Sequence, residues 1–294
     1  MLQITHGIDH LVLTNRALDW NKNEVCTPIE ARQWYSQRRQ SLVKALDCAD
    51  INEDVFITPP DMGNRFYQWK WHMMEHAFYE LSENLAQGDK LTINGKFWNE
   101  WRGKDGKFFD AITQQYQRAT RIDYCFDVFD HPDSVASIWK NCIEPNYAGT
   151  KKTHSVVFGA KGVTIYLGSR KSAYFLRIYD KQAEQNSDHK WIRIELEMKK
   201  HVARQFQGNA HELAQKSALK IAKMCKSLPQ DIMSYLTSLS VNYKEPKYYE
   251  PKAKSSAQIY IETFIKPYLR NCCADNPDVI DDLIQTLIDE RDKQ

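Results

Sequence analysis

The stretch RIDYCFDV, at positions 121–128, alternates between polar and apolar residues in the manner of a β-strand. Successive side chains of a strand point to opposite faces, so Asp123 and Asp127 share one face with Cys125, and the intervening Tyr, Phe and Val side chains share the other. The second face is apolar and must belong to a core. The first face carries two carboxylates, although strand interiors usually avoid Asp and Glu.

The stretch WIRIELEM, at positions 191–198, follows the same rule, with Arg193, Glu195 and Glu197 on one face and aliphatic side chains on the other. If the two strands are neighbours, up to four carboxylates gather, and unpaired carboxylates raise each other's pKa unless a cation lies between them. Hard oxygen ligands of this kind suit Mg²⁺ or Mn²⁺. For either strand alone, an acidic face that simply meets water is the alternative interpretation. The candidate metal ligands are Asp123, Asp127, Glu195 and Glu197.

A third segment, TIYLGSRKSAYFLRIYDKQAE at positions 164–184, lies between the two acidic stretches. Its Gly-Ser pair predicts a turn and residues 174–179 predict a strand, on which Arg177 and Tyr179 share a face. An arginine can hold a phosphate through two hydrogen bonds, and a phenol can attack phosphorus. From the spacing alone, a tyrosine at the edge of a core is the alternative.

The remaining pattern predicts an α+β chain with an antiparallel sheet flanked by helices. Further strands are expected at residues 7–14, 155–158 and 163–167, and a strand–turn–strand at 91–97 around Asn94-Gly95. Turns or loops are expected at 59–64 and 181–190, and a linker at 244–251. Helices are expected at 28–46, 72–86, 209–225, 229–239, 256–272 and 277–291. We therefore predict a catalytic and DNA-binding domain at 1–205 and a helical C-terminal region at 206–294.

The composition is that of a globular protein, with 42% hydrophobic and 27% charged residues among 294. No apolar run reaches the length of a membrane span and no signal peptide is evident, so we expect a cytoplasmic protein without a membrane partner. The seven cysteines have irregular spacing, which favours reduced thiols. The net charge of +2 averages a basic segment at 151–226, net +10, and an acidic one at 275–294, net −5. The basic segment could meet DNA or simply form a solvated face.

Three of these segments resemble the replication initiation factor family in order and spacing: residues 121–127, 166–184 and 193–197. Within the middle one, YLGSR followed by RIYDK is the most specific part, and residues 7–14 and 91–95 echo the family weakly. The family includes rolling-circle initiators of staphylococcal plasmids, replication proteins of some filamentous phages, and relaxases of conjugative transposons. The resemblance covers residues 5–205 and leaves the C-terminal region out.

The resemblance implies that Tyr179 is a nucleophile and that Asp123, with Glu195 or Glu197 and with Asp127, binds the metal. It also implies a nicking-endonuclease fold of the His-hydrophobe-His superfamily with the histidines replaced, because no such triplet occurs in this chain. Tyr124 and Cys125 depart from the family, in which smaller or aliphatic residues are usual, and this concerns local packing.

The expected reaction is transesterification of single-stranded or cruciform origin DNA, with a 5′-phosphotyrosine intermediate, a free 3′-hydroxyl and rejoining by the same residue. A divalent ion, Mg²⁺ or Mn²⁺, would polarise the scissile phosphate. Arg177 would position a phosphate oxygen and Lys181 would lower the phenol pKa, while Arg170, Lys171 and Arg193 would contact DNA. Origin DNA is the expected partner, with a host helicase and a second copy of the chain as further candidates.

Three other interpretations make different predictions. A DNA-binding replication or copy-control protein without catalysis would bind the origin and form no covalent adduct. A nuclease that uses the acidic residues and water would nick without Tyr179. The HMMEH pattern at 72–76 fits inverted zinc peptidases, but it requires a helix there and no further Glu ligand can be identified.

Overall fold

A computed structural model describes residues 3–15, 27–52, 54–55, 61–62, 65–82, 88–143, 154–160, 162–206 and 208–243. The chain divides into two compact units, Met1–Tyr243 and Lys244–Gln294, and all described residues belong to the first. Helices α7 and α8 are part of that first unit, whereas the predicted domain boundary lies at residue 205. A functional division at 205 therefore stays a prediction.

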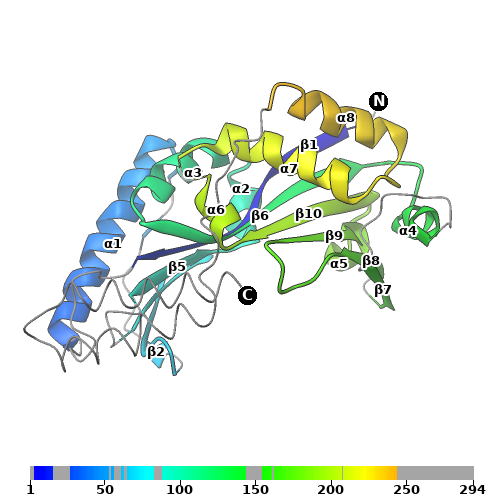
Figure 1. Ribbon diagram of the computed structural model, residues 1–294. Helices are drawn as coiled ribbons and strands as arrows, with labels where there is room; N and C mark the ends of the chain where they lie inside the picture. The colour runs from blue at the N-terminus through cyan, green and yellow to red at the C-terminus, as the bar shows by residue number, and fades with distance from the viewer. Residues whose placement is uncertain are drawn as a thin grey trace, which may run out of the picture. The chain divides into compact units, whose positions relative to one another are not determined.

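The described strands form one antiparallel sheet in the order β2-β3-β4-β5-β1-β6-β10-β9-β8-β7 (Figure 1). The strands are β1 (Gln3–Asn15), β2 (Asp61–Met62), β3 (Trp69–Met74), β4 (Ala77–Leu81), β5 (Asp89–Ile93), β6 (Arg118–Phe129), β7 (His154–Gly159), β8 (Gly162–Leu167), β9 (Tyr174–Asp180) and β10 (Trp191–Lys199). The helices are α1 (Pro28–Cys48), α2 (Gly95–Glu100), α3 (Asp105–Gln114), α4 (Val135–Ile143), α5 (Lys181–Gln185), α6 (His201–Arg204), α7 (Ala210–Met224) and α8 (Gln230–Ser240). The predicted α+β class is confirmed.

The centre of the sheet is formed by β1, β6 and β10, and β6 pairs with β10, so the two acidic stretches are neighbours. Their register places Glu197 opposite Asp123 and Arg193 opposite Asp127. The strands predicted at 155–158, 163–167 and 174–179 are confirmed as β7, β8 and β9, which continue the sheet beyond β10.

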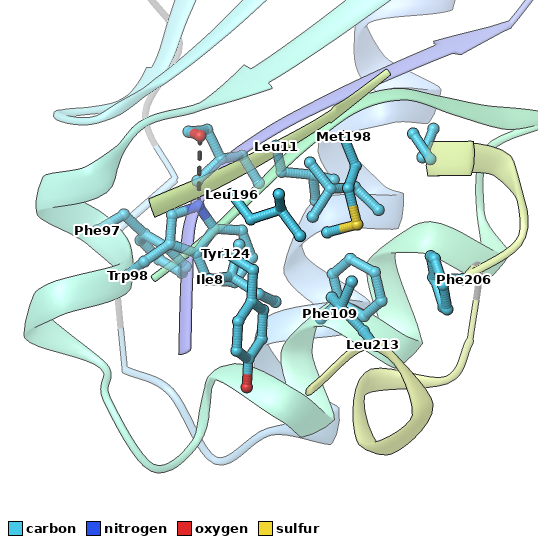
Figure 2. Packing of buried hydrophobic residues seen from close by; sticks show 14 of the residues in the cluster. Ile8, Leu11, Phe97, Trp98, Phe109, Tyr124, Leu196, Met198, Phe206 and Leu213 are labelled. Carbon is cyan, nitrogen blue, oxygen red and sulfur yellow. Dashed lines mark hydrogen bonds between the residues drawn. The ribbon is translucent and has the colours of Figure 1, made fainter. Parts of the chain in front are cut away.

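Helices α3, α7 and α8 lie over one face of these central strands (Figure 1). The apolar side chains of that face, among them Tyr124, Leu196 and Met198, are buried against Phe109 and Leu213 from the helices (Figure 2). This face removes a large apolar area from water, which is the main favourable term in folding. The acidic residues of β6 and β10 therefore point to the other face of the sheet, because side chains of a strand alternate.

Helix α1 is confirmed over its predicted span, and its N-terminus shows why the sequence was informative there. Thr27 accepts a hydrogen bond from the Glu30 backbone and Glu30 accepts one from the Thr27 backbone, which completes a capping box in front of Pro28. Helices α7 and α8 likewise confirm the predictions for 209–225 and 229–239. The helices predicted at 256–272 and 277–291, and the linker at 244–251, lie outside the described residues.

The helix predicted at 72–86 is wrong, because β3 and β4 form a hairpin there with a turn at Glu75 and His76. Trp71 and Met73 are buried while His72 is half-buried, which is the period of a strand. Pairing with a neighbouring strand outweighs the weak local preference for helix. The HMMEH pattern therefore does not lie on a helix, and its histidines do not share a helical face.

The strand–turn–strand predicted at 91–97 is also wrong. Strand β5 ends at Ile93, and Asn94 caps α2 by accepting a hydrogen bond from the Lys96 backbone at 3.2 Å. Asn-Gly here begins a helix, because Asn is as good an N-cap as a turn residue. The loop predicted at 181–190 begins with the short helix α5. None of the described helices is long and apolar enough to cross a bilayer.

Candidate active site

The polar face of three adjacent strands brings the predicted residues together. The register places Arg177 of β9 opposite Glu195 of β10, and Tyr179 opposite Arg193. On the other side of β10, Glu197 is opposite Asp123 of β6. The register sets these pairings, and strand alternation places all of these side chains on one polar face that extends across three strands.

The Arg177 guanidinium lies among the carboxylates of Asp123, Glu195 and Glu197. Its Nη2 donates to Asp123 Oδ2 at 2.9 Å and to Glu195 Oε1, and it lies 3.7 Å from Glu197 Oε2. These three acids, which we call the acidic cluster, are buried, whereas the Arg177 side chain is 26% exposed. Arg121 adds a second cation, with contacts to Asp123 at 2.5 Å and to Glu197 at 3.1 Å. Arginines therefore neutralise most of the charge of the acidic cluster.

One atom of Arg177 is poorly satisfied. Its Nε is buried and has no hydrogen-bond partner within the part of the chain that the structure describes. A buried donor without an acceptor costs about 1–3 kcal/mol. The guanidinium thus uses Nη2 for three acids and leaves its Nε–H without an acceptor in the described residues.

The Tyr179 hydroxyl donates to Glu195 Oε2 at 3.0 Å. Burial, and then the charge of Glu195, raise the pKa of Tyr179 far above its ordinary value. The free protein therefore holds a neutral phenol, and the phenol needs a base to act as a nucleophile. Burial, the charges of Asp9 and Asp123, and the opposing effect of Arg177 leave the pKa of Glu195 raised, at about 8.

Lys181 does not act as the sequence suggested in this arrangement. Its Nζ lies 5.6 Å from the centre of the Tyr179 ring and pairs with Glu184. The pKa of Tyr179 is raised and not lowered, because burial and Glu195 dominate. Lys181 is itself buried at the start of α5, where its Nζ lies near the Tyr179 ring. The partner of the Tyr179 hydroxyl is Glu195.

Asp127 and Arg193 form a separate ion pair, which changes two of the sequence assignments. Arg193 donates to Asp127 through Nε at 2.7 Å and Nη2 at 2.9 Å, and it also contacts Asp9. The Trp191 indole donates to the same Asp127 carboxylate at 2.7 Å. Because Arg193 is 1% exposed and fully engaged, it supports the site from within and is not presented to DNA; Asp127 is likewise committed to this pair and not to the acidic cluster.

The described residues do not present a ready metal site. No group of three or more His, Cys, Asp or Glu side chains in the described ranges is arranged to hold a metal ion. Carboxylates are the right chemistry for Mg²⁺ or Mn²⁺, but the Arg177 guanidinium lies where the acidic cluster would need a metal. The predicted metal ligands Asp123, Glu195 and Glu197 are together, and the ion itself stays a prediction.

Two of the predicted DNA-binding residues lie at the surface. Arg170 and Lys171 are exposed in the turn between β8 and β9. The Arg170 guanidinium lies over the rings of Tyr166 and Phe175, at 5.9 Å from each ring centre. The backbone carbonyls of this turn accept hydrogen bonds from Lys199 and Lys200, which fixes the turn against β10.

Asp9 and Arg121 are members of the site that were not predicted from the sequence. Arg121 could have been found, since it shares a strand face with Asp123 at the i−2 position. Asp9 could not, because a register shift between Ile8 and His10 breaks the alternation of β1 at that residue. Among the described cysteines, Cys48, Cys125, Cys142 and Cys225 are free thiols.

Comparison with known proteins adds two findings. The model of a family described as replication initiation factor matches residues 117–235, which run from just before β6 into α8. The fold is similar to that of a rolling circle replication initiator protein from Geobacillus stearothermophilus, with a TM-score of 0.60 and 16% identity over 81% of this chain and 97% of that one. The predicted fold is confirmed. No curated protein matches this chain.

Proposed function

We propose that this chain starts rolling-circle replication by nicking and rejoining origin DNA through Tyr179, because residues 117–235 match the model of the replication initiation factor family. The observation that carries the proposal is the hydrogen bond from the Tyr179 hydroxyl to Glu195, which lies directly opposite Arg177 on the neighbouring strand. A nucleophile, a base and a phosphate-binding cation then lie on one sheet face.

In the proposed reaction, the Tyr179 oxygen attacks the phosphorus of a single-stranded phosphodiester. The phenol proton passes to Glu195, the bond from phosphorus to the 3′ oxygen breaks, and the proton is passed on to that oxygen, which leaves as a 3′-hydroxyl. The 5′ phosphate stays covalently bound to Tyr179. Rejoining is the reverse reaction, in which the 3′-hydroxyl attacks the phosphotyrosine. The number of phosphate ester bonds is unchanged, so no external energy source is needed.

Proton transfer and charge stabilisation divide between two residues in this scheme. Glu195 accepts from the phenol in the free protein at 3.0 Å, which suits a general base. Arg177 offers a buried Nε–H that the described residues leave without an acceptor, and a phosphate oxygen would satisfy it. A positioned cation of this kind stabilises the charge that develops on the phosphate oxygens.

Several finer points stay proposals. Arg170 and Lys171, exposed beside the site, would contact the DNA backbone, and the affinity should then fall with salt. A divalent ion bound by the acidic cluster is expected, but no step above uses it. A host helicase, a homodimer, a plasmid, phage or conjugative setting, and a cytoplasmic location also stay predictions.

The test is replacement of the hydroxyl. Tyr179→Phe removes the nucleophile and leaves the ring, so it should bind an origin oligonucleotide but form no covalent adduct. The measurement is a denaturing gel with an oligonucleotide labelled on the 5′-phosphate side of the nick, followed by mass mapping of the modified peptide. Tyr174→Phe is the matched control, because Tyr174 lies on the same strand but on the opposite face.

Each outcome selects one function. Adduct formation by the wild type and Tyr174→Phe, and none by Tyr179→Phe, supports the proposal. Nicking that survives in Tyr179→Phe would indicate a nuclease that uses water. Origin binding by the wild type with no adduct, in Mg²⁺ or Mn²⁺ and on a supercoiled origin, would indicate a DNA-binding protein without catalysis.

A further inference from the structure

The inference starts from the uneven use of the Arg177 guanidinium. Its Nη2 contacts all three acids of the acidic cluster, while its buried Nε has no acceptor in the described residues. Most buried polar groups in proteins have a partner, so this arrangement indicates a resting state that a ligand completes. The Arg177 side chain is also more exposed than the acids that it contacts, at 26% against 1% for Asp123.

A DNA phosphate is a better partner for this guanidinium than the present one. A phosphate can accept from Nε and an Nη nitrogen together, in the paired geometry that arginine prefers. That contact would satisfy the free Nε and draw the guanidinium toward the DNA. The acids would then lose the cation that now contacts Asp123, Glu195 and Glu197.

Without Arg177, the acidic cluster must take up either another cation or a proton. Asp123, Glu195 and Glu197 are all buried, and buried carboxylates close together repel each other. Arg121 contacts Asp123 and Glu197, and Lys199 contacts Glu197 at 2.5 Å, so Glu195 depends most on Arg177. A hard divalent cation is the natural replacement for a departing arginine among carboxylates.

We propose that Arg177 makes the binding of DNA and of a divalent cation mutually dependent. In the free protein the Arg177 guanidinium occupies the position of the cation among the three acids, and it leaves that position when it binds a DNA phosphate. The proposal rests on the proposed function for the nature of the ligand. It explains why the acidic cluster has the carboxylates that a divalent cation prefers, although the described residues are not arranged to hold a metal ion in the free protein. By linkage, the cation must raise DNA affinity by the same factor by which DNA raises cation affinity.

The experiment measures Mn²⁺ binding by electron paramagnetic resonance on the full chain carrying Tyr179→Phe, so that no chemistry intervenes. An origin oligonucleotide should tighten Mn²⁺ binding at least tenfold. Arg177→Gln, added to the same protein, removes the resident cation and should bind Mn²⁺ at least tenfold more tightly without DNA. In that variant the oligonucleotide should have little further effect on Mn²⁺ affinity.

Arg170→Gln is the matched control, since it removes one nearby positive charge from a guanidinium that lies over aromatic rings. It should leave Mn²⁺ affinity without DNA unchanged. If Arg177→Gln binds Mn²⁺ no more tightly than its parent, or if Arg170→Gln tightens binding equally, the proposal is overturned. Failure of the proposed function is separate: a wild type that forms no adduct would end the nicking proposal and leave the Mn²⁺ result standing.

Discussion

Arg177 and Arg193 lie on adjacent strands of one sheet face, yet their surroundings give them different roles. The Arg193 side chain is 1% exposed and holds Asp127 through two nitrogens, whereas the Arg177 side chain is 26% exposed and has a buried Nε without an acceptor in the described ranges. A fully engaged buried arginine fixes the shape of a site. A partly engaged, accessible arginine can bind a ligand. Burial and partners therefore assign their roles, although both residues carry the same charge.

Arg193→Met should destabilise the fold by about 3–5 kcal/mol, because it leaves the buried Asp127 carboxylate without its cation. The measurement is equilibrium unfolding in urea, read by tryptophan fluorescence. The exposed Arg204 provides the control, and Arg204→Met should change stability by less than about 0.5 kcal/mol. Equal losses of unfolding free energy in the two variants would show that the Arg193–Asp127 ion pair does not stabilise the fold.

At the scale of elements, the site depends on the short connections around β9. Strand β9 carries Arg177 and Tyr179 and runs directly into α5, where Asp180 caps the helix by accepting from the Ala183 backbone at 2.9 Å. The tip of the β7–β8 hairpin packs against this cap. Gly162 begins β8 with a φ of +84°, and a Cβ there would lie 2.8 Å from the Asp180 Cβ. The hairpin tip thus supports the end of the strand that carries the proposed nucleophile.

Gly162→Ala should therefore destabilise the fold by about 1–3 kcal/mol, from backbone strain together with the contact to α5. The matched control is Gly159→Ala in the same hairpin, where a Cβ would meet nothing within 4 Å. Thermal unfolding of the two variants gives the comparison. Equal stability of the Gly162→Ala and Gly159→Ala proteins would show that the packing of the β7–β8 hairpin against α5 does not stabilise the site.

At the scale of the molecule, one sheet separates two kinds of chemistry. Helices α3, α7 and α8 cover the apolar face of the central strands (Figure 1). The carboxylates and the arginines lie on the other face, because side chains of a strand alternate. The described core includes residues of α7 and α8, such as Leu213, Ile221 and Ile232. The sheet needs these helices to bury its apolar face.

A chain that ends at Tyr243 should therefore fold cooperatively and form the Tyr179 adduct on a short oligonucleotide. It contains the first compact unit with the proposed nucleophile and base. A chain that ends at residue 205, the predicted domain boundary, should lose tertiary packing because α7 and α8 are missing. Near-ultraviolet circular dichroism distinguishes the two. A well-packed 1–205 protein would contradict this view and support the predicted boundary.

The sequence by itself determined the period of each central strand, and with it which residues share a face. It predicted Asp123, Arg177, Tyr179, Glu195 and Glu197 as one site, and the register of β6, β9 and β10 brings them together. Alternation is a local property of the backbone, so it can be read without a partner. It also predicted helix α1, whose capping box is made by near neighbours.

Only the tertiary structure decided the rest. Residues 69–81 are a hairpin because β3 pairs with β4, and β4 also pairs with β5; Asn94 caps α2, which begins directly after β5. The ion pairs also depend on the tertiary structure. Asp127 pairs with Arg193, and the acidic cluster pairs with Arg177, because strands that are far apart in the chain place these side chains within contact distance. Contacts between distant segments depend on strand order and register, and a local pattern does not contain either.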